Sequence, residues 1–213
     1  MVPASLLVQL LALLLLGSPQ AADRRSDDLF ARIYQRGVAK QHTMRSMQAR
    51  FVETTASTLL VKPLVARGTI VAASPARIRM VYTEPEPKTI TMDGRALTVV
   101  WPGRREREQI DITSIQKRID QYFTSAGIDE LRKMFEIVAQ ADPSMRRADR
   151  IDMKPKRKQM REGLTNLELW IDRETDLLVQ MRTTFAGGDQ KTIALEDIAL
   201  NVPVSEETFQ VRP

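Results

Sequence analysis

The chain has 213 residues, and its 32 Lys and Arg residues exceed its 27 Asp and Glu residues, giving a formal net charge of +5. It contains no cysteine, which excludes disulfides, thiol catalysis, cysteine-bound metals and an acylated cysteine of its own. The single histidine, His42, argues against His-rich metal sites and most acid–base dyads.

Residues 1–22 have the layout of a secretory signal peptide, in which an apolar run from Leu6 to Leu16 precedes small residues that end at Ala22. The run is too short to cross a bilayer, which needs about 20 apolar residues. No basic residue precedes the run and Gln20 disrupts an Ala-x-Ala cleavage site, so an uncleaved N-terminal anchor is the alternative. We expect residues 23–213 to form a single exported domain in the periplasm.

The excess of basic residues lies wholly after residue 22. Such a surface can bind nucleic acid, anionic lipid headgroups or acidic proteins, or simply keep the chain soluble. Export argues against nucleic acid, so we expect none as a partner, and a merely soluble surface is the simplest interpretation. Residues 154–158 with Arg161 form a dense basic cluster, which we expect to be a solvated loop between strands, with headgroup or protein docking as the alternative.

In chain order, the first predicted element is a helix from Asp27 to about Met44, with Ser26 as its N-cap. Gly37 weakens this helix and allows a kink or an early end. Apolar and polar residues then alternate as in strands with one buried face, and the connections are short, with Asp93-Gly94 a strong hairpin turn. The expected strands begin near Met47 and then span 68–73, 77–82, 89–92, 97–101 and 106–112.

Helical spacing interrupts the strands after Ser114, and residues 129–135 offer a second short helix. The strands then resume at 135–139, 151–153, 167–172, 179–185 and 192–200. An antiparallel sheet with one apolar face must cover that face or close on itself. The sequence therefore predicts an α+β fold, in which about ten antiparallel strands form a strongly curved sheet with helices covering its concave face.

Several short motifs occur in an order that resembles one protein family. They are Phe51 after the leading helix, Gly68-Thr-Ile-Val, Pro75, Ile78-Arg79, Tyr82, Pro85, Asp93-Gly94, Trp101-Pro102, Met153-Lys-Pro-Lys156, Ile171-Asp172, Thr175, Gly188-Asp189 and the segment from Asn201 to Phe209. Each motif alone is weak, but the ordered set covers nearly the whole chain after residue 22. It is similar to the outer-membrane lipoprotein carrier (LolA) family.

The resemblance implies an incomplete, half-open β-barrel with a helical lid, whose apolar cavity shelters the acyl chains of a lipoprotein or another lipid. Family members take this cargo from an inner-membrane exporter to an outer-membrane acceptor. The resemblance also implies a monomer without cofactor, metal or catalytic residue. A regulatory module that senses lipids or lipoproteins on the same scaffold is the second interpretation. An envelope hydrolase is a distant third, because the chain has a single histidine and no Gly-x-Ser-x-Gly or phosphate-loop motif.

Two positions depart from the family pattern. Ser74 stands where trafficking members usually carry a basic residue, which is thought to hold the lid by hydrogen bonds, so Ser74 marks the lid-latch position. Glu53 stands two residues after Phe51, where a glutamine is common. Both departures suit a divergent paralogue better than the housekeeping carrier.

One parity of each strand should line the concave face, although ordinary core packing is the alternative at every position. The residues expected to line the lipid-binding cavity are Ile78, Met80, Tyr82, Leu97, Val99, Trp101, Leu167, Leu169 and Ile171, with Ile119 and Phe123 from the lid. Nine methionines follow Met1, and they would suit an adaptable apolar pocket, although methionine also fills gaps in ordinary cores.

Overall fold

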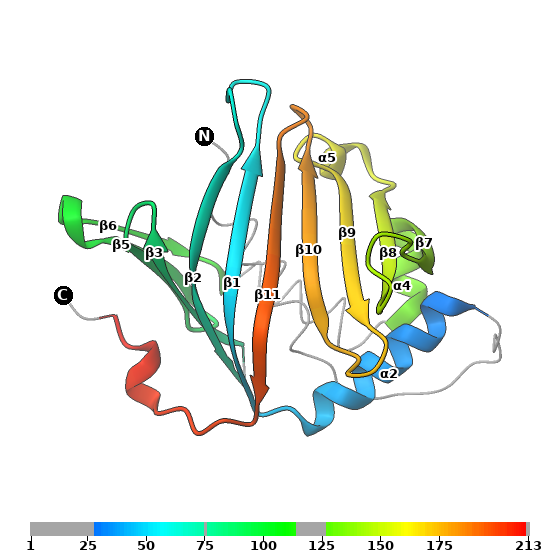
Figure 1. Cartoon of the computed structure of the whole chain (residues 1–213), viewed down its shortest axis with the longest axis horizontal. Coiled ribbons are helices and arrows are strands. Elements are labelled where there is room, and N and C mark those ends of the chain that lie inside the picture. The colour runs from blue at the N-terminus through cyan, green and yellow to red at the C-terminus, as the bar shows by residue number, and fades with distance from the viewer. Residues whose placement is uncertain (1–27, 75, 114–126, 212–213) are drawn as a thin grey trace.

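In the described part of the chain, eleven antiparallel strands form one strongly curved, open sheet, which confirms the half-open barrel expected from the sequence (Figure 1). The computed structural model describes residues 28–74, 76–113 and 127–211. The strands are β1 (Ser46–Ala56), β2 (Leu64–Ala73), β3 (Arg77–Glu84), β4 (Lys88–Met92), β5 (Ala96–Trp101), β6 (Glu106–Asp111), β7 (Phe135–Ala141), β8 (Ala148–Pro155), β9 (Leu164–Asp172), β10 (Leu178–Phe185) and β11 (Gln190–Leu200). The helical elements are α2 (Leu29–Thr43), α4 (Gly127–Met134), α5 (Lys158–Arg161), η1 (Pro102–Arg104) and η3 (Glu206–Phe209).

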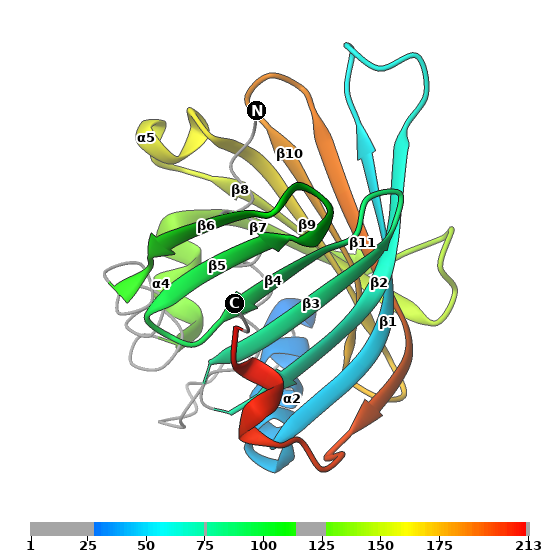
Figure 2. The ribbon, with the colours of Figure 1, turned by 90° about the vertical axis from the view of Figure 1, so that its left-hand side faces the viewer.

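The sheet consists of two meanders that meet in its centre. The strand order is β6-β5-β4-β3-β2-β1-β11-β10-β9-β8-β7, so the first strand pairs with the last, with Phe51 opposite Leu195. The two arms curl toward the same side (Figure 2). The outermost strands, β6 and β7, do not pair with each other in the described part of the chain. Every residue of β6 is exposed, and its charged side chains suit an unpaired edge.

Helices α2 and α4 lie against the β7 end of the sheet. Asp28, and not Ser26, caps α2, because its Oδ1 accepts hydrogen bonds from the backbone N–H groups of Phe30 and Ala31. The expected start at Asp27 is therefore wrong by two residues, and the helix continues through Gly37. Arg132 of α4 pairs with Asp28, which ties the two helices together.

The basic cluster at residues 154–158 is not the single loop that the sequence suggested. Lys154 and Pro155 end strand β8, and Lys158 begins the short helix α5. Lys156 donates a hydrogen bond from Nζ to the carbonyl oxygen of Arg132, and Arg161 donates to that of Lys156. The basic side chains remain exposed, and two of them hold neighbouring backbone in place.

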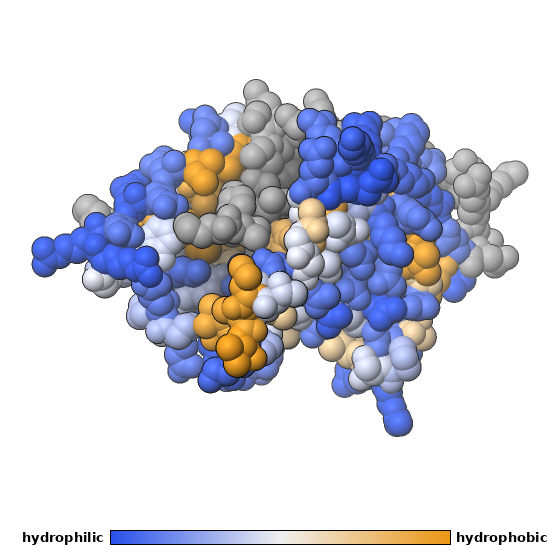
Figure 3. All heavy atoms as spheres, turned by 90° about the horizontal axis from the view of Figure 1, so that it is seen from above, coloured by the Kyte–Doolittle hydropathy of each residue, from blue (hydrophilic) through white to orange (hydrophobic). Residues whose placement is uncertain are grey.

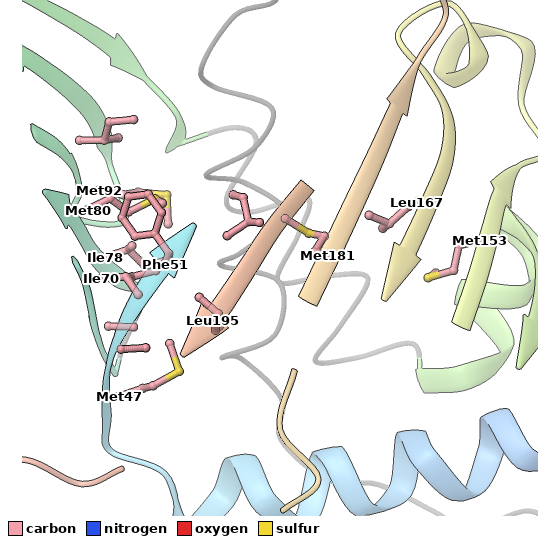
Figure 4. Packing of buried hydrophobic residues seen from close by; sticks show 14 of the residues in the cluster. Met47, Phe51, Ile70, Ile78, Met80, Met92, Met153, Leu167, Met181 and Leu195 are labelled. Atoms are coloured by element: carbon pink, nitrogen blue, oxygen red, sulfur yellow. The ribbon is translucent and has the colours of Figure 1, made fainter. Parts of the chain in front are cut away.

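The core lies on the concave face of the sheet and takes side chains from both arms. Figure 4 shows part of this cluster, including Met47, Phe51, Ile70, Ile78, Met80, Met92, Met153, Leu167, Met181 and Leu195. Phe30 and Ile33 of α2 and Leu131 and Met134 of α4 add to it. Burial of this apolar surface is the main term that stabilises the curved sheet.

Candidate functional site

The concave face brings together all nine cavity residues that were predicted on strands. Seven of them are buried in the core cluster, and Trp101 and Leu169 are partly buried and pack against it. The alternation of apolar and polar residues along the strands thus indicated the face of the sheet on which each of these residues lies. Whether these residues contact lipid stays a prediction, as does the role of Ile119 and Phe123, which lie outside the described residues.

Near the end of this face that bears the β1–β2 connection, Phe51 and Tyr82 pack over Gly68. The two rings meet edge to face, with centroids 4.8 Å apart. A Cβ atom at Gly68 would lie 2.0 Å from the carbonyl oxygen of Val81 and 2.8 Å from the Phe51 ring. Only glycine fits at this position, and its missing side chain lets Tyr82 reach across β2 to β1.

The hydroxyl of Tyr82 donates a 2.8 Å hydrogen bond to the carboxylate of Glu53, which is buried on the apolar parity of β1. The ammonium group of Lys191 lies 3.1 Å from the other carboxylate oxygen. Burial, and then the negative charge of Glu53, raise the pKa of Tyr82 well above its ordinary value. The phenol therefore stays a hydrogen-bond donor at any physiological pH.

A second lysine lies beside this group. Lys88 is half-buried, and its ammonium group lies 4.3 Å from the centroid of the Tyr82 ring. Burial lowers the pKa of Lys88; Glu53 raises it again and Lys191 lowers it further, so the three charges interact. Within the described residues, Lys88 forms no ion pair of its own.

Thr183 belongs to the same polar group on the concave face as Glu53, Tyr82, Lys88 and Lys191. It stands opposite Lys191 in the β10–β11 register, and its side chain is fully buried. Its hydroxyl has no hydrogen-bond partner among the described residues. A buried hydroxyl without a partner costs about 1–3 kcal/mol, so its presence here calls for an explanation.

Sequence reasoning did not assign Glu53, Lys88, Lys191 or Thr183 to the cavity. Lys88 follows a proline-rich turn and Lys191 follows a glycine turn, so both looked like surface residues. The one usable signal was Glu53, an acidic residue at the strand parity that is otherwise apolar. The residues that flank Glu53 on neighbouring strands can be identified only once the strand register is known.

Ser74, the expected lid-latch position, is exposed at the end of β2. Its backbone N–H donates to the carbonyl oxygen of Arg45, and its own carbonyl oxygen accepts a 3.4 Å hydrogen bond from Arg77. Arg77 in turn pairs with Glu206 and covers the ring of Phe209, which fastens η3 to β3. The lid partners expected for this position lie outside the described residues, so the latch stays a prediction.

The convex face carries a buried polar network at the other arm of the sheet. The indole N–H of Trp170 donates a 2.7 Å hydrogen bond to Asp142, and Arg182 lies 5.2 Å from the Trp170 ring centroid. Arg182 also contacts Glu168, and Arg150 lies between Asp142 and Asp152. Since these groups satisfy one another, we interpret the network as structural.

The connection between β1 and β2 exposes apolar side chains. Leu59 is 90% exposed, Val61 is fully exposed, and Leu60, Leu64 and Val65 are exposed as well. From above, an apolar patch occupies the position of this hairpin (Figure 3). Exposed apolar patches on soluble domains often mark contact surfaces.

The described residues also bear on metal binding and on membrane-spanning helices. No three His, Asp or Glu side chains in these residues are placed to hold a metal ion. Among the helices of the described segments, none has the length and apolar character needed to cross a membrane.

The family model "Outer membrane lipoprotein carrier protein LolA" matches residues 42–212. The chain belongs to the LolA family. This match covers the entire sheet, including the concave face and the polar group at its end. Among curated proteins, none matches the chain in sequence.

Solved structures show that this LolA-family member shares its fold with distant relatives. An uncharacterised conserved protein from Thermus thermophilus has 12% identity and a TM-score of 0.53, over 85% of this chain and 93% of its own. Mycobacterium tuberculosis lipoprotein LppX has 13% identity and a TM-score of 0.51, over 82% and 94%. MucB has 13% identity and a TM-score of 0.52 over 87% of this chain, which spans only 64% of MucB.

Proposed function

We propose that this LolA-family protein is a periplasmic carrier that binds the acyl chains of lipoproteins or other lipids on its concave face and moves them toward the outer membrane. In this proposal residues 1–22 direct export, and residues 23–213 work as one domain. The observation that carries it is the concave face itself. Side chains from every strand except β6 form one apolar surface inside a barrel that does not close within the described residues.

The side chains on this face suit a cargo of variable shape. Met47, Met80, Met92, Met153 and Met181 all belong to the buried cluster on the strands. Methionine is unbranched and flexible, so such a surface can repack around acyl chains. Each buried methylene contributes about 0.8 kcal/mol, so one acyl chain supplies several kcal/mol without any covalent bond.

A regulatory module on the same scaffold is the second candidate. MucB, which shares the fold, has been solved in complex with MucA. The exposed apolar side chains of the β1–β2 connection offer a surface that a protein partner could contact. A module that senses lipids would use the same apolar concave face, so the two candidates differ in the protein partner that regulation requires.

Val99→Asp tests the concave face as the lipid site. Val99 is 2% exposed and stands opposite Ile90, so an aspartate there places an unpaired charge among apolar side chains. We expect binding of a fluorescent fatty acid to be lost. Val100→Asp, on the other face of the same strand, is the matched control and should bind normally. Equal binding by both variants would show that this face is not the pocket.

Native mass spectrometry of protein purified from the periplasm distinguishes the two candidates. A carrier should leave the cell with acylated cargo, and this cargo should be reduced in a Val99→Asp variant that is folded by circular dichroism. A regulator should instead associate with one protein partner in fixed stoichiometry. Protein that carries neither lipid nor acylated protein would contradict the carrier proposal.

A further inference from the structure

We propose that Lys88, together with Lys191 and Thr183, binds the anionic headgroup of the lipid, a carboxylate or a phosphate, at the end of the concave face. This inference rests on the proposed function and deepens it, because it names the chemical class of the cargo. The group spans strands β4, β10 and β11 and lies on the same face as the apolar cluster.

The charges of the group do not cancel. Lys88 and Lys191 bring two ammonium groups, and Glu53 forms an ion pair with Lys191. Glu86 also acts on the charge of Lys88, but its carboxylate is paired with Arg104. Lys191 and Tyr82 already take both carboxylate oxygens of Glu53, at 3.1 Å and 2.8 Å. The ammonium group of Lys88 instead lies over the face of the Tyr82 ring, 4.3 Å from its centroid. A half-buried ammonium in this position attracts an anion.

Hydrogen-bond donors outnumber acceptors in the same place. The buried hydroxyl of Thr183 has no partner among the described residues, and it flanks Lys191 across the β10–β11 pair. An ammonium group offers three donors, and the contact of Lys191 with Glu53 is an ion pair to a single carboxylate oxygen. Carboxylate and phosphate oxygens accept several hydrogen bonds at once, so either group would satisfy Lys88, Lys191 and Thr183 together.

A purely structural ion pair would not need the second lysine. Lys191 and Tyr82 are sufficient to neutralise and orient Glu53, and Lys88 adds a second positive charge without an ion-pair partner among the described residues. The long apolar surface and the cationic end together match an amphiphile with an acidic head. The acylated cysteine of a lipoprotein has no anionic group at its lipid end, so the site favours a fatty acid or an anionic phospholipid.

Isothermal titration calorimetry on the secreted full-length protein, freed of lipid, tests this inference with matched pairs of probes. Palmitate is compared with hexadecanol, and dipalmitoyl phosphatidic acid with dipalmitoylglycerol, so that each pair differs only in the anionic group. We expect the anionic member of at least one pair to bind about tenfold more tightly, and the pair that shows this identifies the source as carboxylate or phosphate.

Lys88→Met should abolish the preference and leave binding of the neutral lipid unchanged, because it removes the charge and keeps the apolar stem. Lys88→Arg should restore the preference. Lys154→Met, at an exposed position on the opposite face of β8, is the control and should behave as the parent. Equal binding of both members of each pair, or a preference that persists in Lys88→Met, would overturn the inference. Failure to bind any of the four lipids would instead contradict the proposed function.

Discussion

Tyr82 on β3 and Glu53 on β1 are joined across the intervening strand by a 2.8 Å hydrogen bond from the phenol to the carboxylate. Gly68 makes this bond possible, because it leaves no side chain between the two residues. The bond holds a buried carboxylate that forms an ion pair with Lys191 and acts on the charge of Lys88. The geometry of this pair therefore controls both the stability of the sheet centre and the charge that a ligand would meet.

Glu53→Gln separates these two effects. The change removes the negative charge that competes with an anionic ligand, so palmitate should bind about tenfold more tightly while hexadecanol binds as before. It also deprives Lys191 of its partner, so the free energy of unfolding should fall by about 1–3 kcal/mol. Calorimetry and urea denaturation measure the two quantities. Glu207→Gln, at an exposed position of η3, should change neither, and weaker palmitate binding in Glu53→Gln would contradict the assignment.

Gly68→Ala should strongly destabilise the protein. The added Cβ would meet the Val81 carbonyl oxygen at 2.0 Å and the Phe51 ring at 2.8 Å, and backbone cannot move aside as a flexible side chain can. We expect a loss of about 3 kcal/mol in the free energy of unfolding, measured by urea denaturation. Gly187→Ala has no atom within 4 Å of the new methyl group and is the matched control. A stability equal to the parent in Gly68→Ala would show that Phe51 and Tyr82 do not pack as described.

The face on which strand residues lie could be predicted from the sequence, because an alternating pattern reports directly which parity is apolar. Leu167, Leu169 and Ile171 were placed on the concave face by this rule, and they lie there. Trp170 stands at the opposite parity of the same strand and is nevertheless buried. Its indole N–H donates a hydrogen bond to Asp142, which lies 28 residues earlier, and no local sequence pattern predicts a contact at that separation.

The polar group on the concave face could not be predicted for a related reason. Lys88, Lys191 and Glu53 are far apart in the sequence, and the two lysines lie at strand ends, where charged residues are usually solvated. Only the pairing of β1 with β11, and of β3 with β4, brings them together. The start of helix α2 also involves a contact between residues that are far apart in the sequence. Asp28 and Ser26 are both good N-caps by residue type, and Asp28, which caps the helix, is the one that pairs with Arg132 of α4.

Asp142 should make the stability of the protein depend on pH in the acid range. Hydrogen bonds from the side chains of Ser144 and Trp170, with further backbone bonds from Ser144 and Met145, hold the pKa of Asp142 at about 2, below the ordinary 3.8. A folded-state pKa below the unfolded value means that the charged carboxylate stabilises the fold. That contribution is complete above pH 3.8 and is lost as the pH falls toward 2.

Asp142→Asn tests this dependence. At neutral pH the amide replaces a carboxylate that accepts from the buried indole N–H of Trp170, so the free energy of unfolding should fall by about 1–3 kcal/mol. Between pH 4 and pH 2 the variant should lose less stability than the parent, because it lacks the group that titrates there. Urea denaturation across this range, with Glu108→Gln as the exposed control, measures both effects. If Asp142→Asn keeps the full acid dependence of the parent, carboxylates elsewhere cause it, and the Trp170 network contributes through packing alone.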